Sequence, residues 1–283
     1  GSEMCIRDRG KSRSDTIENV VKSAREIAAG GVKEIVLTGV NTGDFGIRDG
    51  VRKDTFEDVI RKLDEVSSIE RIRISSIEPN LLSEEIIRFV AKSRKFAHHF
   101  HIPLQSGSNK MLKAMRRRYL RELYLERVQT IKEVMPECCI GADVIVGFPG
   151  ESREDFLETY QFINEMDVSY LHVFSYSERP NTLAISMENV VSSAERKERS
   201  KMLRTLSEKK RRYFYSQFIG KEMDVLFEKD IASGKIHGFT DNYIRVAVSY
   251  NHELLNQIRR VKMLEIDDTG VMQGELTGNT VPV

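Results

Sequence analysis

The 283-residue sequence contains only three cysteines, which excludes a scaffold held together by several disulfides. A small, odd number of thiols is typical of a protein in the reducing cytoplasm. No stretch comes near the roughly 18 consecutive apolar residues that a membrane-spanning helix needs. No apolar signal segment is visible near the start either, so we expect a cytoplasmic protein with no membrane partner. The net charge of +1 gives the whole chain no general attraction for a polyanion.

Two kinds of pattern divide the chain. Apolar residues make up 40% of it, which supports a sizeable core, and the length suits about two domains. Up to about residue 215, helical patterns alternate with short apolar strands. After Ser216, short strands follow one another, separated by Gly, Asn and Asp. We therefore expect an α/β domain followed by a small all-β domain.

The first part predicts a parallel sheet. Asp15 with Glu18 resembles the capping box of a first helix, which the pair Gly30-Gly31 ends. Further helices are predicted at 55–68, 83–94, 120–135, 153–166 and 192–215, and strands at 33–41, 71–79, 98–107, 139–150 and 170–177. Helices that alternate with single strands form βαβ units, and right-handed crossovers curl these strands into part of a barrel. Because a βα barrel begins on a strand and this pattern begins on a helix, we expect one strand and the loop after it to be missing.

The second part predicts a small antiparallel barrel of the OB type. Its expected strands are 222–229, 235–240, 243–250, 259–267 and 271–278.

Four predicted strands of the first part end in polar residues, at the place where sites collect in barrels of parallel strands. The stretches are "TGVN" (38–41), "SSIEP" (75–79), "PLQSGS" (103–108) and "GFPGE" (147–151). Their glycines let a ligand approach the backbone, whose N–H groups bind carboxylate or phosphate. Glu78 and Gln105 are suited to bind ribose hydroxyls or an amino group. Each stretch alone is also typical of a turn, but four in one array favour a site.

Together these stretches resemble the radical S-adenosylmethionine (SAM) methylthiotransferase family. The similar segments are "RGKSRS" (9–14), "LTGVN" (37–41), "RISSIEP" (73–79), "HIPLQSGSNKMLKAMRRRY" (101–119), "GADVIVGFPGE" (141–151) and "HVFSYSERPNT" (172–182). The resemblance implies a partial radical SAM (β/α) barrel over residues 9–215 and a TRAM domain, an RNA-binding barrel, over residues 216–283. The loop "LTGVNTGDFG" is most similar to the branch that methylthiolates N6-threonylcarbamoyladenosine at position 37 of tRNA. The alternative is the branch that acts on isopentenyladenosine in tRNA.

The resemblance implies that SAM binds at the polar strand ends. The loop after the first predicted strand holds the SAM amino group, and Glu78 and Gln105 line the pocket. The strand from Asp143 to Phe148 lies against the adenine. The implied cofactor-binding residues are Thr38, Gly39, Asn41, Ser76, Glu78, Gln105, Ser106, Asp143 and Phe148.

The resemblance also implies two [4Fe-4S] clusters in the full-length protein, neither of them ligated by this chain. Family members carry a C-x-x-x-C-x-x-C loop just before "RGKSRS", whose three thiolates bind a cluster and leave one iron open for SAM. Here Cys5 stands alone in "GSEMCIRD", which does not match the family's strand. We therefore expect residues 1–8 to be a non-native scar, and the chain to begin after the catalytic loop. The fragment then contains no catalytic residue and is inactive alone.

The other potential metal ligands predict no metal site. Cys138 and Cys139 are adjacent, so they point to opposite faces of a strand and are expected to be buried apolar residues. His99 and His101 share a strand face and offer two ligands. However, no Cys or carboxylate follows them at ligand spacing.

Two basic stretches are candidates for RNA contact. Segment 194–215 has nine Lys and Arg against three Glu, and "MRRRY" (115–119) places three arginines beside an aromatic ring. The predicted RNA-binding residues are Arg116, Arg117, Arg118, Lys209, Lys210, Arg211 and Arg212. A solvated helix face explains such a charge run equally well. The terminal barrel is net acidic, although its Phe239, Tyr243 and Tyr250 are suited to stack bases or to fill its core.

Two functions of different classes remain. The chain is either the SAM-binding and tRNA-binding part of a tRNA methylthiotransferase or a non-catalytic RNA-binding fragment. In both cases we expect tRNA as the partner and a monomer.

Overall fold

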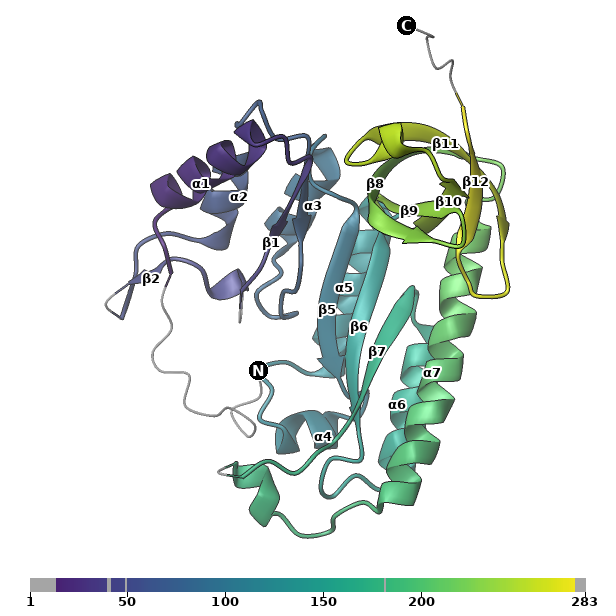
Figure 1. The fold of residues 1–283 in the computed structure, drawn as a ribbon. Helices are drawn as coiled ribbons and strands as arrows, with labels where there is room; N and C mark the ends of the chain where they lie inside the picture. Colours follow the sequence, from purple (N-terminus) through teal and green to yellow (C-terminus); the bar gives the residue numbers. More distant parts are fainter. Residues whose placement is uncertain (1–13, 40–41, 49, 181, 278–283) are drawn as a thin grey trace, which may run out of the picture.

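The computed structural model shows a curved α/β sheet followed by a small closed β-barrel (Figure 1). The structure describes residues 14–39, 42–48, 50–180 and 182–277. The expected fold class, part of a (β/α) barrel followed by a small β-barrel, is confirmed.

Seven helices are found in the described residues, and six of them match the predicted ones. They are α1 (Ile17–Ala29), α2 (Phe56–Asp64), α3 (Glu84–Lys92), α4 (Asn109–Ala114), α5 (Arg121–Val134), α6 (Arg153–Glu165) and α7 (Ser193–Ser216). Capping boxes begin α2, α6 and α7, because a Thr or Ser side chain there accepts from the N–H three residues on, and the Asp or Glu at that position accepts from the N–H of the Thr or Ser. The predicted capping box of α1 is wrong: Thr16, not Asp15, is the N-cap, and it accepts from the N–H of Asn19.

The five predicted parallel strands are present, but they form two hydrogen-bonded parts and not one continuous sheet. Strand β1 (Glu34–Leu37) pairs with β4 (Arg71–Ile74), and β5 (His99–Gln105), β6 (Cys139–Val146) and β7 (Tyr170–Ser175) form the other part. A parallel bridge between Ile72 and Phe96 links the two parts. The strands are shorter than predicted because their polar ends form loops. A short hairpin, β2 (Ile47–Arg48) with β3 (Val51–Arg52), was not predicted.

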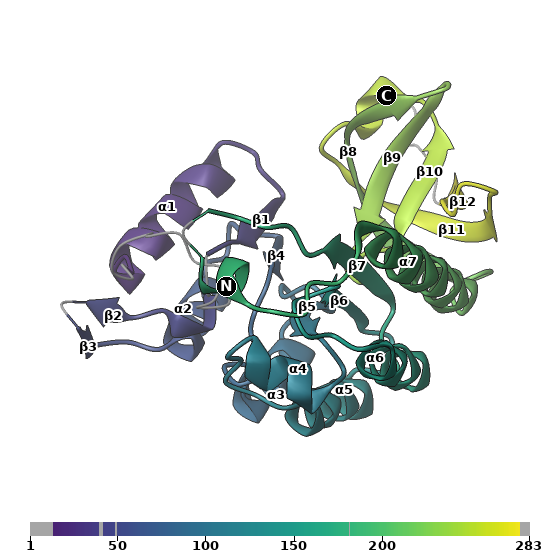
Figure 2. The same ribbon diagram turned by 90° about the horizontal axis from the view of Figure 1, so that it is seen from below.

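The two faces of the sheet differ in chemistry. Helices α3, α5, α6 and α7 lie along one face (Figures 1 and 2), where Ile140, Ala142 and Val144 of β6 are fully buried in the main core. Side chains alternate along a strand, so the residues between them point the other way. We call that side the open face. Its polar side chains on described strands are Glu34, Arg71, Arg73, His99, His101, Asp143, Tyr170 and His172.

The terminal barrel contains five strands in the closed order β10-β12-β11-β8-β9. Its strands are β8 (Glu222–Ala232), β9 (Lys235–Thr240), β10 (Arg245–Ser249), β11 (Ile258–Ile266) and β12 (Met272–Leu276). The predicted barrel is confirmed with one correction. It is not wholly antiparallel, because β10 and β12 pair in parallel and thereby close it.

The terminal barrel packs against the end of the sheet where the strands begin (Figure 1). Arg73 donates hydrogen bonds to the carbonyl oxygens of Thr240 (3.1 Å) and Asp241 (2.9 Å). Both Arg73 and Arg71 are bound by the carboxylate of Glu34, so the charge at this buried junction is partly neutralised. The terminal barrel therefore lies at the end of the sheet opposite the polar strand ends.

Candidate functional site

The ends of the five parallel strands meet at one rim of the sheet. The N–H of Ser75 donates to the carbonyl oxygen of Leu37 (3.0 Å), and the N–H of Ile77 donates to that of His101 (3.1 Å). Farther along the sheet, Gln105 lies opposite Val144, and Val146 lies opposite Ser175. The four polar stretches therefore follow strands that end side by side.

The loops after β1 and β4 are joined at this rim. Thr38 and Gly39 are exposed, whereas Asn41 lies outside the described residues. The hydroxyl of Thr42 donates to the carbonyl oxygen of Ser76, which is half-buried. Thr38, Gly39 and Ser76 thus lie on neighbouring loops with exposed or partly exposed surface.

Glu78 is already paired with an arginine. Its Oε1 lies 3.1 Å from Nη1 of Arg117, and the two side chains are 17% and 6% exposed. The Nε of Arg117 is also buried and has no hydrogen-bond partner. Arg117 is therefore not placed to contact an RNA backbone, and Glu78 is held at the rim by a buried cation.

Gln105 and Ser106 are both buried, and they differ in what they contact. Gln105 ends β5 in the left-handed region, with φ of 70°, beside an irregularity in the pairing with β6. The Oγ of Ser106 lies 3.0 Å from Oγ1 of Thr159 on α6 and accepts from the N–H of Ser108. The side chain of Ser106 therefore fastens the loop to α6, and any ligand contact must come from its backbone.

A close approach explains the glycine in the same loop. A Cβ on Gly107 would lie 2.8 Å from the Cα of Thr159, inside van der Waals contact. The loop is further held by Ser108, whose hydroxyl donates to Asp155 (3.0 Å). The stretch "PLQSGS" is thus shaped by packing on α6 as much as by any ligand.

The end of β6 is also rigid. Gly147 has φ of 75°, which favours glycine, and its N–H donates to the Glu151 carboxylate (3.1 Å). Glu151 is in turn paired with the buried Arg199 of α7 at 2.5 Å. Phe148 is fully buried and packs with Met111 and other apolar residues. Its ring fills a small core and does not lie open at the rim.

The two described cysteines do not fit an iron–sulfur cluster. Cys138 belongs to the core under the helices, and Cys139 belongs to the core shared with the terminal barrel, which confirms that they point to opposite faces. Burial raises the pKa of the Cys139 thiol to about 12 and that of Cys138 well above its usual value. Cluster ligands are convergent thiolates, and these are two separate neutral thiols.

A His–Asp cluster on the open face was missed by the sequence analysis. Nε2 of His101 lies 2.8 Å from Oδ1 of Asp143, and Nδ1 of His172 lies 3.4 Å from the same oxygen. Burial raises the pKa of Asp143, but the two histidines outweigh it and hold the pKa at about 2. Spacing along the chain from His101 does not reveal these partners, because they come from the neighbouring strands β6 and β7.

A tyrosine extends this cluster along β5. The hydroxyl of Tyr170 lies 2.9 Å from Nε2 of His99 and 3.3 Å from Nδ1 of His101. Burial lowers the pKa of His99 well below its usual value, so its ring is neutral. One connected polar network therefore runs across three strands, from buried His99 to the half-exposed His172.

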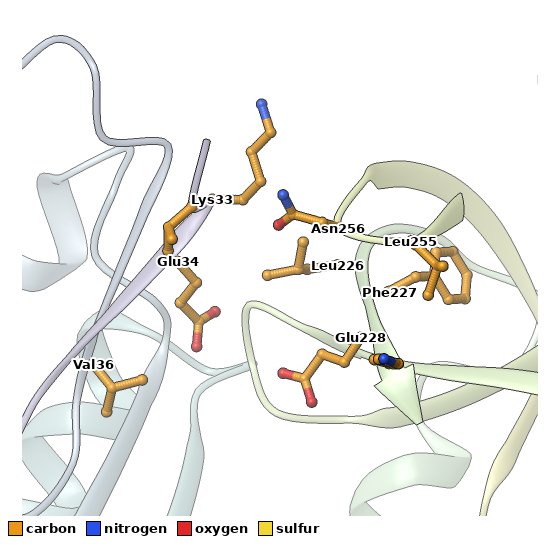
Figure 3. Close-up of a pocket in the computed structure, with 10 residues that line it drawn as sticks. Lys33, Glu34, Val36, Leu226, Phe227, Glu228, Leu255 and Asn256 are labelled. Carbon is orange, nitrogen blue, oxygen red and sulfur yellow. The ribbon is translucent and has the colours of Figure 1, made fainter. Parts of the chain in front are cut away.

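A separate pocket of about 350 Å³ lies between β1 and the terminal barrel (Figure 3). The carboxylates of Glu34 and Glu228 face into it, and Lys33 and Asn256 also line it. Burial and the nearby Glu34 raise the pKa of Glu228. None of the residues predicted to bind the cofactor lines this pocket, so it is distinct from the rim.

The predicted RNA-binding residues fall into two groups. Arg116, Arg118 and Lys209 are exposed. In contrast, Lys210 donates to the carbonyl oxygen of Met166 (2.7 Å), and Arg212 donates to that of Asp268 (2.8 Å). Arg211 is half-buried, and its Nε is buried without a hydrogen-bond partner. The second group therefore holds α7 to its neighbours.

The described helices include none that is long and apolar enough to cross a membrane.

Comparison with known proteins connects this arrangement to one family. The model of the radical SAM superfamily matches residues 2–163, so the match starts within the residues that the sequence analysis sets apart. A threonylcarbamoyladenosine tRNA methylthiotransferase, MtaB, from Bacillus subtilis is 39% identical over 91% of this chain and 58% of its own length. A tRNA-2-methylthio-N(6)-dimethylallyladenosine synthase from Sulfurimonas denitrificans is 34% identical over 97% of this chain and 64% of its own. The chain thus spans less than two thirds of either relative.

The fold is also similar to a solved structure. The radical SAM methyltransferase TsrM from Kitasatospora setae matches with a TM-score of 0.50 and 15% identity, over 60% of this chain and 33% of that one. At this identity the likeness concerns the fold alone.

Proposed function

Since the chain belongs to the radical SAM superfamily, we propose that it is the SAM-binding and tRNA-binding part of a tRNA methylthiotransferase. Its substrate is N6-threonylcarbamoyladenosine at position 37 of tRNA. The observation that carries the proposal is the 39% identity to a protein of that name, which extends over 91% of the chain. Because the relatives are longer than this chain, the activity belongs to a whole protein of which this chain is a part.

The choice of substrate rests on two comparisons that agree. The relatives named for threonylcarbamoyladenosine are 39% and 40% identical, whereas the one from Sulfurimonas named for dimethylallyladenosine is 34% identical. The loop "LTGVNTGDFG" favours the same branch. Isopentenyladenosine in tRNA remains the alternative substrate.

The rim at the strand ends is the proposed SAM site. The loop of Thr38, Gly39 and Asn41 holds the amino group, and Gln105 and Glu78 line the pocket. Arg117 keeps the Glu78 side chain at the rim through their ion pair. Backbone groups of the glycine-containing loops supply further hydrogen bonds, since side chains such as Ser106 are already used elsewhere.

The iron–sulfur chemistry belongs to residues beyond the described part. A [4Fe-4S] cluster, when bound, supplies the electron that cleaves SAM to a radical. Neither described cysteine fits such a cluster, and Cys5 stands alone among the preceding residues. We propose two clusters in the whole protein and no activity from this chain by itself.

The proposed tRNA contacts lie on α7 and the terminal barrel. Of Phe239, Tyr243 and Tyr250 in that barrel, Tyr250 is 43% exposed and free to stack on a base. Tyr243 instead stacks on His99 at 4.3 Å and on Phe239 at 4.8 Å, which places both at the junction with the sheet. Contact with tRNA therefore depends on exposed basic residues and Tyr250 more than on the pair Phe239 and Tyr243.

Nucleoside analysis tests the proposal. Because the activity is proposed for a whole protein of which this chain is a part, the gene of that whole protein is expressed in a bacterium whose own threonylcarbamoyladenosine methylthiotransferase gene has been deleted, and digested tRNA is examined by mass spectrometry. We expect the 2-methylthio derivative of threonylcarbamoyladenosine to reappear. Methylthiolation of isopentenyladenosine in its place would select the alternative branch, and no methylthiolation of any nucleoside would contradict the proposal.

The second candidate is a non-catalytic RNA-binding protein, which the exposed basic side of α7 favours. The two functions differ in whether the chain binds SAM. An RNA-binding scaffold is expected not to bind SAM, whereas the proposed enzyme part binds it at the rim. A cytoplasmic monomer is expected for either, and analytical ultracentrifugation measures the oligomeric state.

A further inference from the structure

We propose that His101, Asp143 and His172 form a mononuclear binding site for a divalent transition-metal cation on the open face. One ligand comes from each of the adjacent strands β5, β6 and β7. All three ligand atoms lie within 4.8 Å of one another. The proposal rests on this geometry and does not depend on the proposed methylthiolation.

The separations between the ligand atoms suit one shared ion. Nε2 of His101 and Nδ1 of His172 lie 2.8 Å and 3.4 Å from the same carboxylate oxygen of Asp143. Two donors bound to one ion at about 2.1 Å lie about 3.0 Å apart at a right angle and about 3.4 Å apart at a tetrahedral angle. The separations of both nitrogens from Asp143 therefore already fit a shared ion, and the histidine rings turn to bring the two nitrogens to a common centre.

The ligand types select the class of metal. Two imidazoles with one carboxylate suit Fe²⁺, Zn²⁺ or Co²⁺, whereas Mg²⁺ and Ca²⁺ prefer oxygen ligands. The carboxylate of Asp143 is the one oxygen ligand of the three. The site is thus expected to discriminate against Mg²⁺.

A second shell of hydrogen bonds orients His101. Its Nδ1 lies 3.3 Å from the hydroxyl of Tyr170, which also meets Nε2 of His99. Metal-bound histidines ordinarily use the second ring nitrogen in this way, because the bond fixes the tautomer and the ring. Gly141 makes room for the arrangement, since a Cβ there would lie 2.3 Å from Cζ of Tyr170.

The proposed metal site is accessible to solvent, and its protein ligands do not fill the coordination shell of the ion. His172 is 54% exposed, whereas His101 is 10% exposed, so one side is anchored and the other faces solvent. Three protein ligands leave coordination positions for water or for a substrate group. A purely structural site has four protein ligands and is closed.

Cobalt titration tests the proposal on the chain as it stands. The protein is stripped with a chelator, Co²⁺ is added, and the visible d–d absorption is followed; Zn²⁺ displacement gives the relative affinity. We expect one equivalent of bound Co²⁺, and no saturable signal with His101→Ala, Asp143→Asn or His172→Ala. Because outer-shell changes typically weaken metal binding about 10-fold to 100-fold, Tyr170→Phe is expected to fall in that range.

Matched variants separate this site from other ligands. His252→Ala removes an exposed histidine of the terminal barrel, and Cys5→Ser removes a thiol; both are expected to leave Co²⁺ binding unchanged. His172→Ala is the most informative change, because a half-exposed ring is replaced without opening the core. If the three histidine and aspartate variants bind Co²⁺ like the parent, or the parent shows no saturable binding, the trio is a hydrogen-bonded cluster and the proposal is wrong.

Discussion

Glu34 binds two arginines at the junction between the sheet and the terminal barrel. Arg71 and Arg73 are each less than 10% exposed, and both also donate to carbonyl oxygens of the terminal barrel. Burial raises the pKa of Glu34, but the hydrogen bonds and charge of the two arginines outweigh it and lower the pKa. One carboxylate therefore compensates two buried cations that join the two domains.

Removing this carboxylate is expected to destabilise the protein. Glu34→Gln keeps the shape but leaves two buried guanidinium groups without a counter-ion, so the free energy of unfolding falls by about 3 kcal/mol. Urea denaturation measures the change. Glu26→Gln is the control, because Glu26 forms an exposed pair with Lys22 and is expected to change stability by less than about 0.5 kcal/mol. Equal effects of the two variants would contradict the role given to Glu34.

Asp155 makes the free energy of unfolding depend on pH in the acidic range. Burial raises its pKa, but hydrogen bonds from Lys110, Ser152 and Ser108 outweigh burial and lower it. The folded pKa thus lies below the unfolded value of about 3.9. Asp155 therefore contributes stability above that value, and the contribution is lost as the pH falls through the folded pKa.

The Asp155→Asn variant tests this sign. Below about pH 5, the free energy of unfolding of the parent protein is expected to fall with decreasing pH more steeply than that of the variant. Urea denaturation at a series of pH values gives both slopes. Parallel slopes would show that Asp155 has the same pKa in the folded and unfolded chain.

Single residues show how far the sequence predicts a site. The motifs identify the loops at the rim, because glycine and polar residues directly after an apolar strand indicate where that strand ends. Partners from distant elements do not follow from spacing: Ser106 bonds to Thr159, and Asp143 meets His172. Spacing along the chain therefore does not reveal the packing contact of Ser106 or the cluster around His101, and the predicted cofactor contact of Ser106 stays a prediction.

At the scale of elements, helix α7 combines a structural side with a charged side. Leu203, Leu206 and Phe214 are buried, and the hydroxyl of Ser207 accepts from the N–H of Leu171 (2.8 Å). Lys210 also belongs to the structural side, since burial lowers its pKa and its ammonium group donates to carbonyl oxygens after α6. The exposed basic residues of the charged side include Lys197, Lys201, Arg204 and Lys209.

The charged side of α7 is expected to bind tRNA. Changing Lys197, Lys201, Arg204 and Lys209 together to Ala removes up to four phosphate contacts, so the affinity falls and its dependence on salt becomes shallower. Filter binding at several salt concentrations measures both. The control Lys210→Ala is expected to lower thermal stability and to keep the salt slope. An unchanged dependence of affinity on salt in the fourfold variant would show that this side of α7 is a solvated surface without tRNA contacts.

The length of an element decides whether its pattern is visible. The long helices and the strands can be predicted because the same hydrophobic pattern repeats over several turns or alternations. The six-residue α4 and the hairpin of β2 and β3 are too short to show a period, and neither was predicted. The predicted strand ends lie too far along the chain because the polar residues that follow Leu37, Ile74 and Val146 form loops.

At the scale of the whole molecule, the rim and the terminal barrel lie at opposite ends of the sheet (Figure 1). Between them runs the open face with its network from His99 to His172. If tRNA is bound by the terminal barrel and α7, as proposed, it is expected to extend along this face to bring a base to the rim. The sequence predicts the two domains and their order, whereas contacts such as Arg73 to Asp241 depend on a docking that no local pattern encodes.

The central claim is that SAM binds at the rim formed by the strand ends. A two-dimensional amide NMR titration of the chain with SAM tests it directly and tolerates weak binding. We expect saturable shifts of the signals of Gly39, Ser76 and Gln105, and unchanged signals from Gly238 and Gly274 of the terminal barrel. Shifts confined to Val32 and Asn256, which line the pocket beside β1, or no shifts at saturating SAM, would contradict the account.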